Sequence, residues 1–189
     1  MPEAPRIETD RLVLRMPVRT DFDAYAPTLM SERARHIGGP FTLEDAWKDF
    51  CAEVAGWTLS GAGSWAVELK ETGAFCGLVG FSIRPDFPER ELGWVLVPEA
   101  EGRGIAAEAA AAARALALVD WGWPTLVSYI DHDNVRSRTL AERLGARLDP
   151  AATPPGPCLV YRHPAPGPTP AAAPDRTAAP KAAATETKP

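Results

Sequence analysis

The feature that most constrains this chain is a strand-like segment, residues 91–97, followed by a glycine-punctuated turn and a long alanine-rich helix. Gly102 and Gly104 remove side chains where the backbone must turn tightly or approach a ligand. A helix that starts directly after such a turn presents unpaired N–H groups and the positive end of its dipole. The segment therefore predicts an anion site, most naturally for phosphate.

Hydrophobic periodicity and turn residues predict a mixed sheet flanked by helices. The expected strands are residues 11–15, 64–69, 75–83, 89–97, 125–130 and 158–163, and the expected helices are about 20–30, 42–59, 103–120 and 134–144. Thr42 is placed to cap the second helix, and Gly145 to end the last one. Antiparallel hairpins in the middle and one strand–helix–strand crossover predict an α/β fold.

Composition divides the chain into a folded domain and a tail. Residues 164–189 are rich in Pro, Ala, Thr and Gly and have no aromatic residue. Such a segment cannot bury enough apolar surface to offset the entropy of ordering it. We therefore expect residues 1–163 to form one domain and residues 164–189 to be a disordered tail.

Charge and cysteine content restrict the partners and the compartment. The formal net charge of −5 argues against general nucleic-acid binding, which needs a basic surface, and is compatible with a cationic substrate. Cys51, Cys76 and Cys158 are scattered without metal-ligand spacing, which is typical of reduced thiols. No apolar run approaches membrane length, and the first residues lack a signal-peptide core. We expect a cytoplasmic protein with no metal and no membrane partner.

Three interpretations of the glycine turn compete. A Walker loop is excluded because the chain has no Gly-Lys-Ser/Thr. The dinucleotide pattern G-x-G-x-x-A is matched by Gly102, Gly104 and Ala107, but residues 98–101 separate the strand from the first glycine, and too little chain remains for a doubly wound domain. A tight turn without any ligand is the third interpretation.

A second motif, one strand and one helix later, favours a ligand. Asn134-Val-Arg-Ser137 precedes Leu144-Gly145, giving the spacing Asn-x-x-Ser-x-x-x-Ala-x-x-Leu-Gly. With the G-x-G-x-A turn before it, this arrangement resembles the GNAT acyltransferases, and within them the RimJ/RimL type. The phrase Ile7-Glu-Thr-Asp-Arg-Leu-Val-Leu-Arg15, Glu91-Leu-Gly-Trp94 and Glu108 are also similar to that subgroup. The resemblance covers residues 7–163.

The resemblance implies the GNAT fold, with a mixed, mostly antiparallel twisted sheet of six to seven strands and about four helices. It implies acetyl-CoA as co-substrate, with its pyrophosphate on the backbone N–H groups of the glycine turn and its pantetheine arm along residues 95–97. Arg103 would add charge at a phosphate or remain a solvated surface residue, and Asn134 would contact the arm or merely cap its helix. The implied cofactor-binding residues are Val95, Leu96, Val97, Gly102, Arg103, Gly104, Ile105, Ala106, Asn134 and Ser137.

The resemblance also implies an acid. Ser137 stands where the subgroup has the serine proposed to protonate the departing thiolate, and Ala141 stands where the wider family often has tyrosine. The alternative is that Ser137 only hydrogen-bonds the cofactor or an earlier helical carbonyl. Direct transfer also needs a base, and Glu91 is the first choice if it is partly desolvated. Asp131 and Asp133 are the runners-up.

Other polar residues are weaker candidates. His132 is a lone loop histidine, and His36 and His163 have no partner visible in the sequence. Glu101 takes the first position of the family signature Q/R-x-x-G-x-G/A, so we expect it to point away from the phosphates and acetyl-CoA binding to be weaker than is typical. Ala146 replaces the usual phenylalanine after Leu-Gly.

The sequence therefore predicts an N-acetyltransferase that moves an acetyl group from acetyl-CoA to a primary amine in a ternary complex. The acceptor is expected to be a protein N-terminus or a small-molecule amine. The alternative is a catalytically inactive acyl-CoA-binding sensor or partner module. Family members often form homodimers, although no feature of this chain argues for one.

Overall fold

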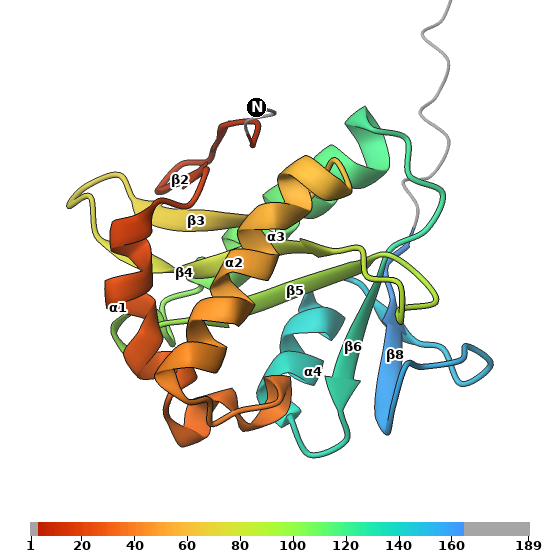
Figure 1. The fold of residues 1–189 in the computed structure, drawn as a ribbon. Coiled ribbons are helices and arrows are strands. Elements are labelled where there is room, and N and C mark those ends of the chain that lie inside the picture. The colour runs from red at the N-terminus through yellow and green to blue at the C-terminus, as the bar shows by residue number, and fades with distance from the viewer. Residues whose placement is uncertain (1–3, 165–189) are drawn as a thin grey trace, which may run out of the picture.

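The computed structural model describes residues 4–164, so the predicted tail lies, except for Pro164, outside the described residues. One sheet of eight strands runs through the molecule in the order β1-β2-β3-β4-β5-β6-β8-β7 (Figure 1). All neighbouring strands are antiparallel except β5 and β6. The strands are β1 Ile7–Glu8, β2 Leu12–Arg15, β3 Ser64–Leu69, β4 Phe75–Ser82, β5 Glu91–Leu96, β6 Val127–Asp131, β7 Arg147–Leu148 and β8 Cys158–Arg162.

Helices cover both faces of the sheet, with α1 and α2 on one face and α3 on the other (Figure 1). The α-helices are α1 Arg19–Leu29, α2 Leu43–Leu59, α3 Ile105–Ala115 and α4 Val135–Arg143. Two 3-10 segments, η1 Glu32–Ile37 and η2 Pro98–Ala100, and a π-helical turn, η3 Leu116–Asp120, connect them. None of the helices in the described part of the chain combines the length and apolar character needed to span a membrane.

Local sequence signals explain where the helices begin and end. The hydroxyl of Thr42 accepts a hydrogen bond from the Asp45 N–H at 3.1 Å and so caps α2, as predicted. Gly145 has a φ of 82° just after α4, which is the left-handed conformation that ends helices. Ala109, Ala110 and Ala113 of α3 are fully buried. Their small side chains let this helix lie close to the sheet.

An aromatic cluster fills the core between α2 and the sheet. Trp57 of α2 meets Trp65 of β3 edge to face, with ring centroids 4.5 Å apart. Trp65 meets Phe81 of β4 in the same way at 5.5 Å. Such pairs add about 0.5–1.5 kcal/mol each beyond the burial of their area. This packing holds α2 against the middle of the sheet, where it forms one wall of the site described below.

The fold class predicted from the sequence is confirmed, with two differences in detail. The sheet has eight strands rather than six to seven, because β1 and β7 add two residues each and are too short to show an alternating pattern. The helix predicted at 103–120 is regular only to Ala115, after which the chain continues as the π-helical turn η3.

The parallel pair β5–β6 divides the sheet. Its register contains a single pair, Glu91 with Val127, whereas the neighbouring antiparallel pair β4–β5 has six. Beyond this point β5 and β6 diverge. The main chain of residues 93–96 therefore has no strand partner on the β6 side among the described residues, and a cavity opens there.

Candidate active site

The turn between β5 and α3 has the geometry expected of an anion site. Gly102 and Gly104 have φ of 72° and 76°, which L-residues with side chains rarely adopt. The N–H groups of residues 102–104 find no acceptor among the described residues. A Cβ added at Gly102 would meet nothing within 4 Å. The turn therefore presents donors to open space at the start of α3, which suits a phosphate group.

Residues from the N-terminal segment hold this turn in place. Oε1 of Glu108, in α3, accepts hydrogen bonds from the Thr9 hydroxyl and from the Arg11 N–H. The guanidinium of Arg11 pairs with Glu108 at 2.7 Å and donates to the Arg103 carbonyl at 3.1 Å. The Arg103 side chain is exposed and forms no ion pair with any described residue.

Glu101, just before the first glycine, points at two arginines. Its Oε2 lies 2.7 Å from Nη1 of Arg33, in η1, and 2.8 Å from Nη2 of Arg136, in α4. Partial burial raises the pKa of Glu101, but the hydrogen bonds from Arg136 and Arg33 outweigh it, and the pKa lies below its usual value. The carboxylate that stands out in the sequence is therefore neutralised by two cations beside the turn.

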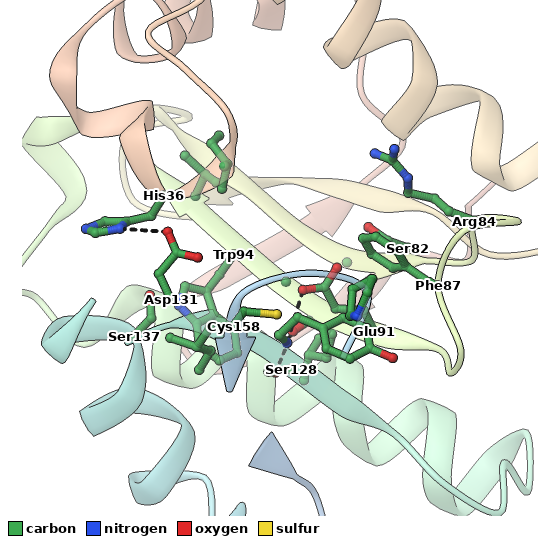
Figure 2. A pocket seen from close by; sticks show the side chains of 18 of the residues that line it. His36, Ser82, Arg84, Phe87, Glu91, Trp94, Ser128, Asp131, Ser137 and Cys158 are labelled. Carbon is green, nitrogen blue, oxygen red and sulfur yellow. Dashed lines mark hydrogen bonds and ion pairs between the residues drawn. The ribbon is translucent and has the colours of Figure 1, made fainter. Parts of the chain in front are cut away.

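A cavity of about 420 Å³ occupies the gap between the diverging strands β5 and β6 (Figure 2). Of the residues predicted as functional, Glu91, Val95, Asn134, Ser137 and the runner-up Asp131 line this cavity. Ile105 and Val97 are buried in the core, so they can contact a ligand only through their backbone. His132 is exposed and lies outside the lining.

Glu91 begins β5 at the point where the strands separate, and its side chain lies in the centre of the cavity (Figure 2). Its Oε1 accepts a hydrogen bond of 3.3 Å from the Tyr129 N–H, across the gap. Burial raises the pKa of Glu91 to about 7, although the Tyr129 N–H lowers it. A carboxylate with such a pKa can accept a proton near neutral pH.

Ser137 lies in the first turns of α4 and faces β5. Its Oγ accepts a 3.2 Å hydrogen bond from Nε1 of Trp94. Because the indole N–H can only donate, the hydroxyl proton of Ser137 is left for another partner. The Asn134 side chain accepts from the Ser137 N–H at 3.1 Å, so Asn134 is the N-cap of α4 and also lines the cavity.

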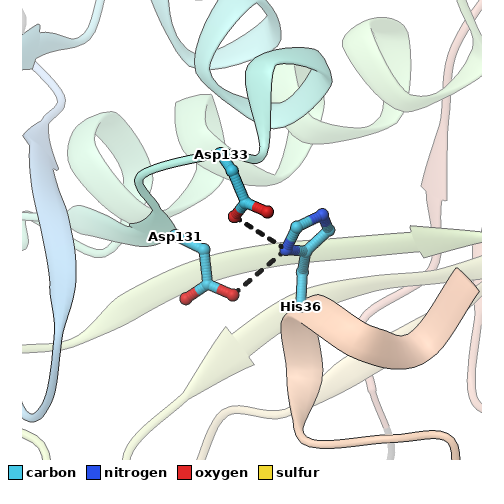
Figure 3. A group of neighbouring side chains, drawn as sticks. All are labelled: His36, Asp131 and Asp133. Atoms are coloured by element: carbon cyan, nitrogen blue, oxygen red, sulfur yellow. Dashed lines mark hydrogen bonds and ion pairs between the residues drawn. The ribbon is translucent and has the colours of Figure 1, made fainter.

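His36 has partners that the sequence did not reveal. Its Nδ1 lies 3.1 Å from Oδ2 of Asp131 and 3.6 Å from Oδ1 of Asp133, and the ring points between the two carboxylates (Figure 3). The three ligand atoms lie within 4.8 Å of one another, a spacing that could hold a metal ion. In the structure the hydrogen bond between His36 and Asp131 joins η1 to the end of β6. His163 also has a partner, the Ser128 hydroxyl at 3.0 Å.

Sequence reasoning missed the residues that α1 and α2 contribute to the cavity. Tyr25 of α1 and both Asp49 and Glu53 of α2 line its wall. The i, i+4 spacing of the two acidic residues is the one signal that could have placed them on a common helix face. The hydrogen bond from the Ser64 hydroxyl to Glu53 connects this wall to β3.

The family model for the acetyltransferase (GNAT) domain matches residues 11–147. The chain belongs to the GNAT acetyltransferase family.

Solved GNAT structures resemble this one over most of its length. The chain is 44% identical to an acetyltransferase of Agrobacterium tumefaciens strain C58, with 85% of this chain and 94% of that chain covered and a TM-score of 0.81. It is 29% identical to a GNAT-family protein of Bordetella pertussis, with 85% and 100% covered and a TM-score of 0.70. RimL, a ribosomal L7/L12 α-N-protein acetyltransferase solved with coenzyme A, is 17% identical, with 84% and 95% covered and a TM-score of 0.65. This last likeness shows the fold alone.

Membership of the GNAT family means that the chain is an acetyl-CoA-dependent acetyltransferase. The donor set of the β5–α3 turn fits the phosphates of that co-substrate, because it offers unpaired N–H groups and neighbouring arginines. Strand β5 begins at Glu91 in the cavity and ends at Leu96, a few residues before this turn. The GNAT fold thus brings Asn134, Ser137 and Glu91 together around one cavity, and the glycine turn follows the far end of β5.

Proposed function

We propose that the protein is an N-acetyltransferase, similar to the RimJ/RimL type, that transfers an acetyl group from acetyl-CoA to a primary amine in a ternary complex. The observation that carries the proposal is Glu91, whose partly desolvated carboxylate lies in the cavity with a pKa of about 7. A protonated amine cannot attack a thioester, so a group that removes its proton near neutral pH is what the reaction needs.

Acetyl-CoA would bind along the edge of β5. Backbone N–H groups of residues 102–106 would hold the pyrophosphate, with Arg103 adding positive charge. The main chain of residues 95–97 would hydrogen-bond the pantetheine arm as an added strand does, because among residues 4–164 no strand pairs with this part of the β5 edge on the β6 side. Asn134 would contact the arm from the start of α4, and Pro98 ends the available edge because it has no N–H.

Two side chains would then carry out the proton transfers. Glu91 takes one proton from the substrate ammonium, through an ordered water molecule or directly, which leaves a nitrogen lone pair to form the C–N bond with the acetyl carbon. As the C–S bond breaks, the Ser137 hydroxyl donates its proton to the sulfur and regains one from the nitrogen. The hydrogen bond from Trp94 fixes the Ser137 oxygen so that its proton can point toward the departing sulfur.

The rival function is an acyl-CoA-binding sensor that has lost catalysis. Calorimetric titration of the full chain with acetyl-CoA, followed by CoA-release assays over a panel of amines, separates the two. We expect saturable binding and turnover, and Glu91→Gln should lower kcat by about 100-fold or more at pH 7 while leaving acetyl-CoA binding nearly unchanged. Glu71→Gln, in the exposed β3–β4 turn, is the matched control. Binding without turnover of any amine would favour the sensor.

We also propose that residues 1–163 form the acetyltransferase domain and that the protein acts in the cytoplasm. All three cysteines are free thiols in the structure, and Cys76 is buried. Limited proteolysis should remove the C-terminal segment without loss of acetyl transfer. A loss of activity in the trimmed chain would contradict the proposed boundary.

A further inference from the structure

The cavity has more negative than positive groups. Five carboxylates line it: Asp49, Glu53, Asp86, Glu91 and Asp131. The two basic side chains in its wall are already engaged, since Arg84 pairs with Asp86 at 3.2 Å and His36 pairs with Asp131 at 3.1 Å. Arg84 lies on the opposite side of the cavity from His36 and Asp131 (Figure 2). The remaining three carboxylates have no basic side chain within 4 Å among residues 4–164.

Asp49 and Glu53 form the part of this surplus that the acetyl transfer itself does not use. They stand at i and i+4 on α2, so both side chains leave the same face of the helix, where two like charges repel each other. Burial raises the pKa of both carboxyl groups, and the charge of Arg84 does not cancel this effect. We refer to these two residues as the α2 carboxylate pair. A pair of this kind is destabilising unless a cation enters the cavity beside it.

Tyr25 provides an independent sign that this cavity wall has a free hydrogen-bonding position. Its side chain is only 2% exposed and lines the same cavity as the α2 carboxylate pair. Its hydroxyl forms no hydrogen bond with any described residue. The hydroxyl oxygen is not enclosed by protein atoms, so it opens into the cavity and its hydrogen-bonding capacity is free for a ligand atom. A phenol oxygen that shares a cavity wall with two carboxylates suits an ammonium group, which donates three hydrogen bonds.

We infer that the acceptor is a compact aliphatic diamine, held at its second ammonium group by Asp49, Glu53 and the Tyr25 hydroxyl. This inference rests on the proposed N-acetyltransferase function, because it assigns the other nitrogen of the diamine to Glu91 and the acetyl group. Glu91 removes the proton from that nitrogen, while the α2 carboxylate pair keeps the second nitrogen charged and bound. A free amino acid is a poor fit, since its carboxylate would face the same acidic wall.

A matched series of acceptors tests the inference. We compare 1,4-diaminobutane, butylamine and 4-aminobutyrate with the full chain at saturating acetyl-CoA, and measure CoA release. A partly buried charged hydrogen bond contributes about 1.5–3 kcal/mol, so kcat/KM for the diamine should exceed that for butylamine by about tenfold or more. The value for 4-aminobutyrate should be the lowest of the three. Equal values for the diamine and butylamine would overturn the inference.

Variants locate the effect. Asp49→Asn and Glu53→Gln should each raise KM for 1,4-diaminobutane by about tenfold with little change in kcat, and should leave butylamine unaffected. Glu44→Gln, an exposed acidic residue of the same helix, is the matched control and should change neither acceptor. An equal loss for both amines would indicate a structural role for the pair and would contradict the inference.

A binding measurement separates this inference from the proposed function. Glu91→Gln keeps Tyr25 and the α2 carboxylate pair while removing the base. In the presence of CoA it should still bind 1,4-diaminobutane in a calorimetric titration, and the same variant carrying Asp49→Asn and Glu53→Gln should bind it at least tenfold more weakly. If no amine is acetylated but this difference is found, the proposed function fails and the cation site stands. If amines are acetylated and the difference is absent, the proposed function stands and the cation site fails.

Discussion

The guanidinium of Arg11 lies 2.7 Å from the carboxylate of Glu108, although the two residues are 97 positions apart in the chain. The same guanidinium donates to the Arg103 carbonyl at 3.1 Å. Arg11, in the N-terminal segment, therefore holds the glycine turn through the Arg103 carbonyl and holds the helix that follows, α3, through Glu108. The turn depends on this contact for its shape as much as on its own glycines.

Removing this contact should weaken acetyl-CoA binding more than it weakens the fold. Half-exposed ion pairs contribute about 0–1 kcal/mol to stability, so Arg11→Ala should shift the unfolding midpoint only slightly. It should raise the Kd for acetyl-CoA by about three- to tenfold, because the turn loses the support of the Arg103 carbonyl. Arg6→Ala, which breaks an exposed ion pair with Glu8, is the control and should change neither quantity. An unchanged Kd for Arg11→Ala would argue against the bracing role.

Two matched glycine variants separate the role of the glycine turn in acetyl-CoA binding from the cost of backbone strain. Gly102→Ala places a side chain at a φ of 72°, at a cost of about 1–2 kcal/mol, and directs the new methyl group into the space proposed for phosphate. Gly73→Ala, in the β3–β4 turn, has a φ of 70° and an equally open surrounding. Both variants should lose similar stability in urea unfolding, but only Gly102→Ala should bind acetyl-CoA at least tenfold more weakly. Equal binding by the two would contradict the phosphate site.

Whether kcat or the Kd for acetyl-CoA changes in Ser137→Ala shows whether the serine acts as an acid or only contacts the cofactor. Ser137→Ala should lower kcat by about 100-fold and leave the Kd for acetyl-CoA within about twofold, because only the proton donor is lost. Trp94→Phe keeps the aromatic ring and the serine but removes the 3.2 Å hydrogen bond, and its effect on kcat should be smaller. If Ser137→Ala raises Kd and spares kcat, the serine is a cofactor contact only.

Glu91 should make stability fall as pH rises. The pKa of its carboxyl is about 7 in the folded protein against an ordinary value of 4.5, so the folded state binds the extra proton between these two pH values. Its contribution opposes folding above pH 7, by at most on the order of 3 kcal/mol, and disappears below about pH 4.5. Glu91→Gln should therefore be more stable than the natural protein at pH 8 in urea unfolding, with little difference at pH 4.5.

The same pKa predicts how activity depends on pH. Only the ionised carboxylate of Glu91 accepts a proton, so kcat/KM should rise as pH increases through about 7. The rate that remains in Glu91→Gln should lack this rise. A rise that persists in the variant would assign the base to another carboxylate of the cavity.

The parts of this protein that could be read from its sequence are those determined by neighbouring residues. The strand Ser64–Leu69 follows from the glycine-containing turns on either side of it, and the cap Thr42 follows from a hydroxyl three residues before its partner N–H. The surroundings of Glu101 and His36 could not be predicted in this way. Arg33 and Arg136 approach Glu101 from separate elements, and Asp131 lies 95 residues from His36.

The cavity wall illustrates the same limit. Asp49 and Glu53 resemble ordinary surface acids of an amphipathic helix, because nothing in the sequence states that α2 crosses the open end of the sheet. Their half-buried positions in the cavity wall follow from the packing of Trp57 onto Trp65, which fixes the position and rotation of the helix. A residue's chemistry is thus visible in the sequence, whereas the solvent and charges around it are properties of the fold.

The single pair between β5 and β6 has a consequence for how the molecule responds to its ligand. Strands β1–β5 and strands β6–β8 form two hydrogen-bonded blocks, joined at the divide by Glu91 with Val127 and by bonds such as that from the Ser128 hydroxyl to the Leu92 carbonyl. A pantetheine arm in the gap would hydrogen-bond to the β5 edge while contacting α4, and so would connect the two blocks. The two blocks would then open together rather than separately. Hydrogen exchange in β6 and β8 should therefore slow when acetyl-CoA is present.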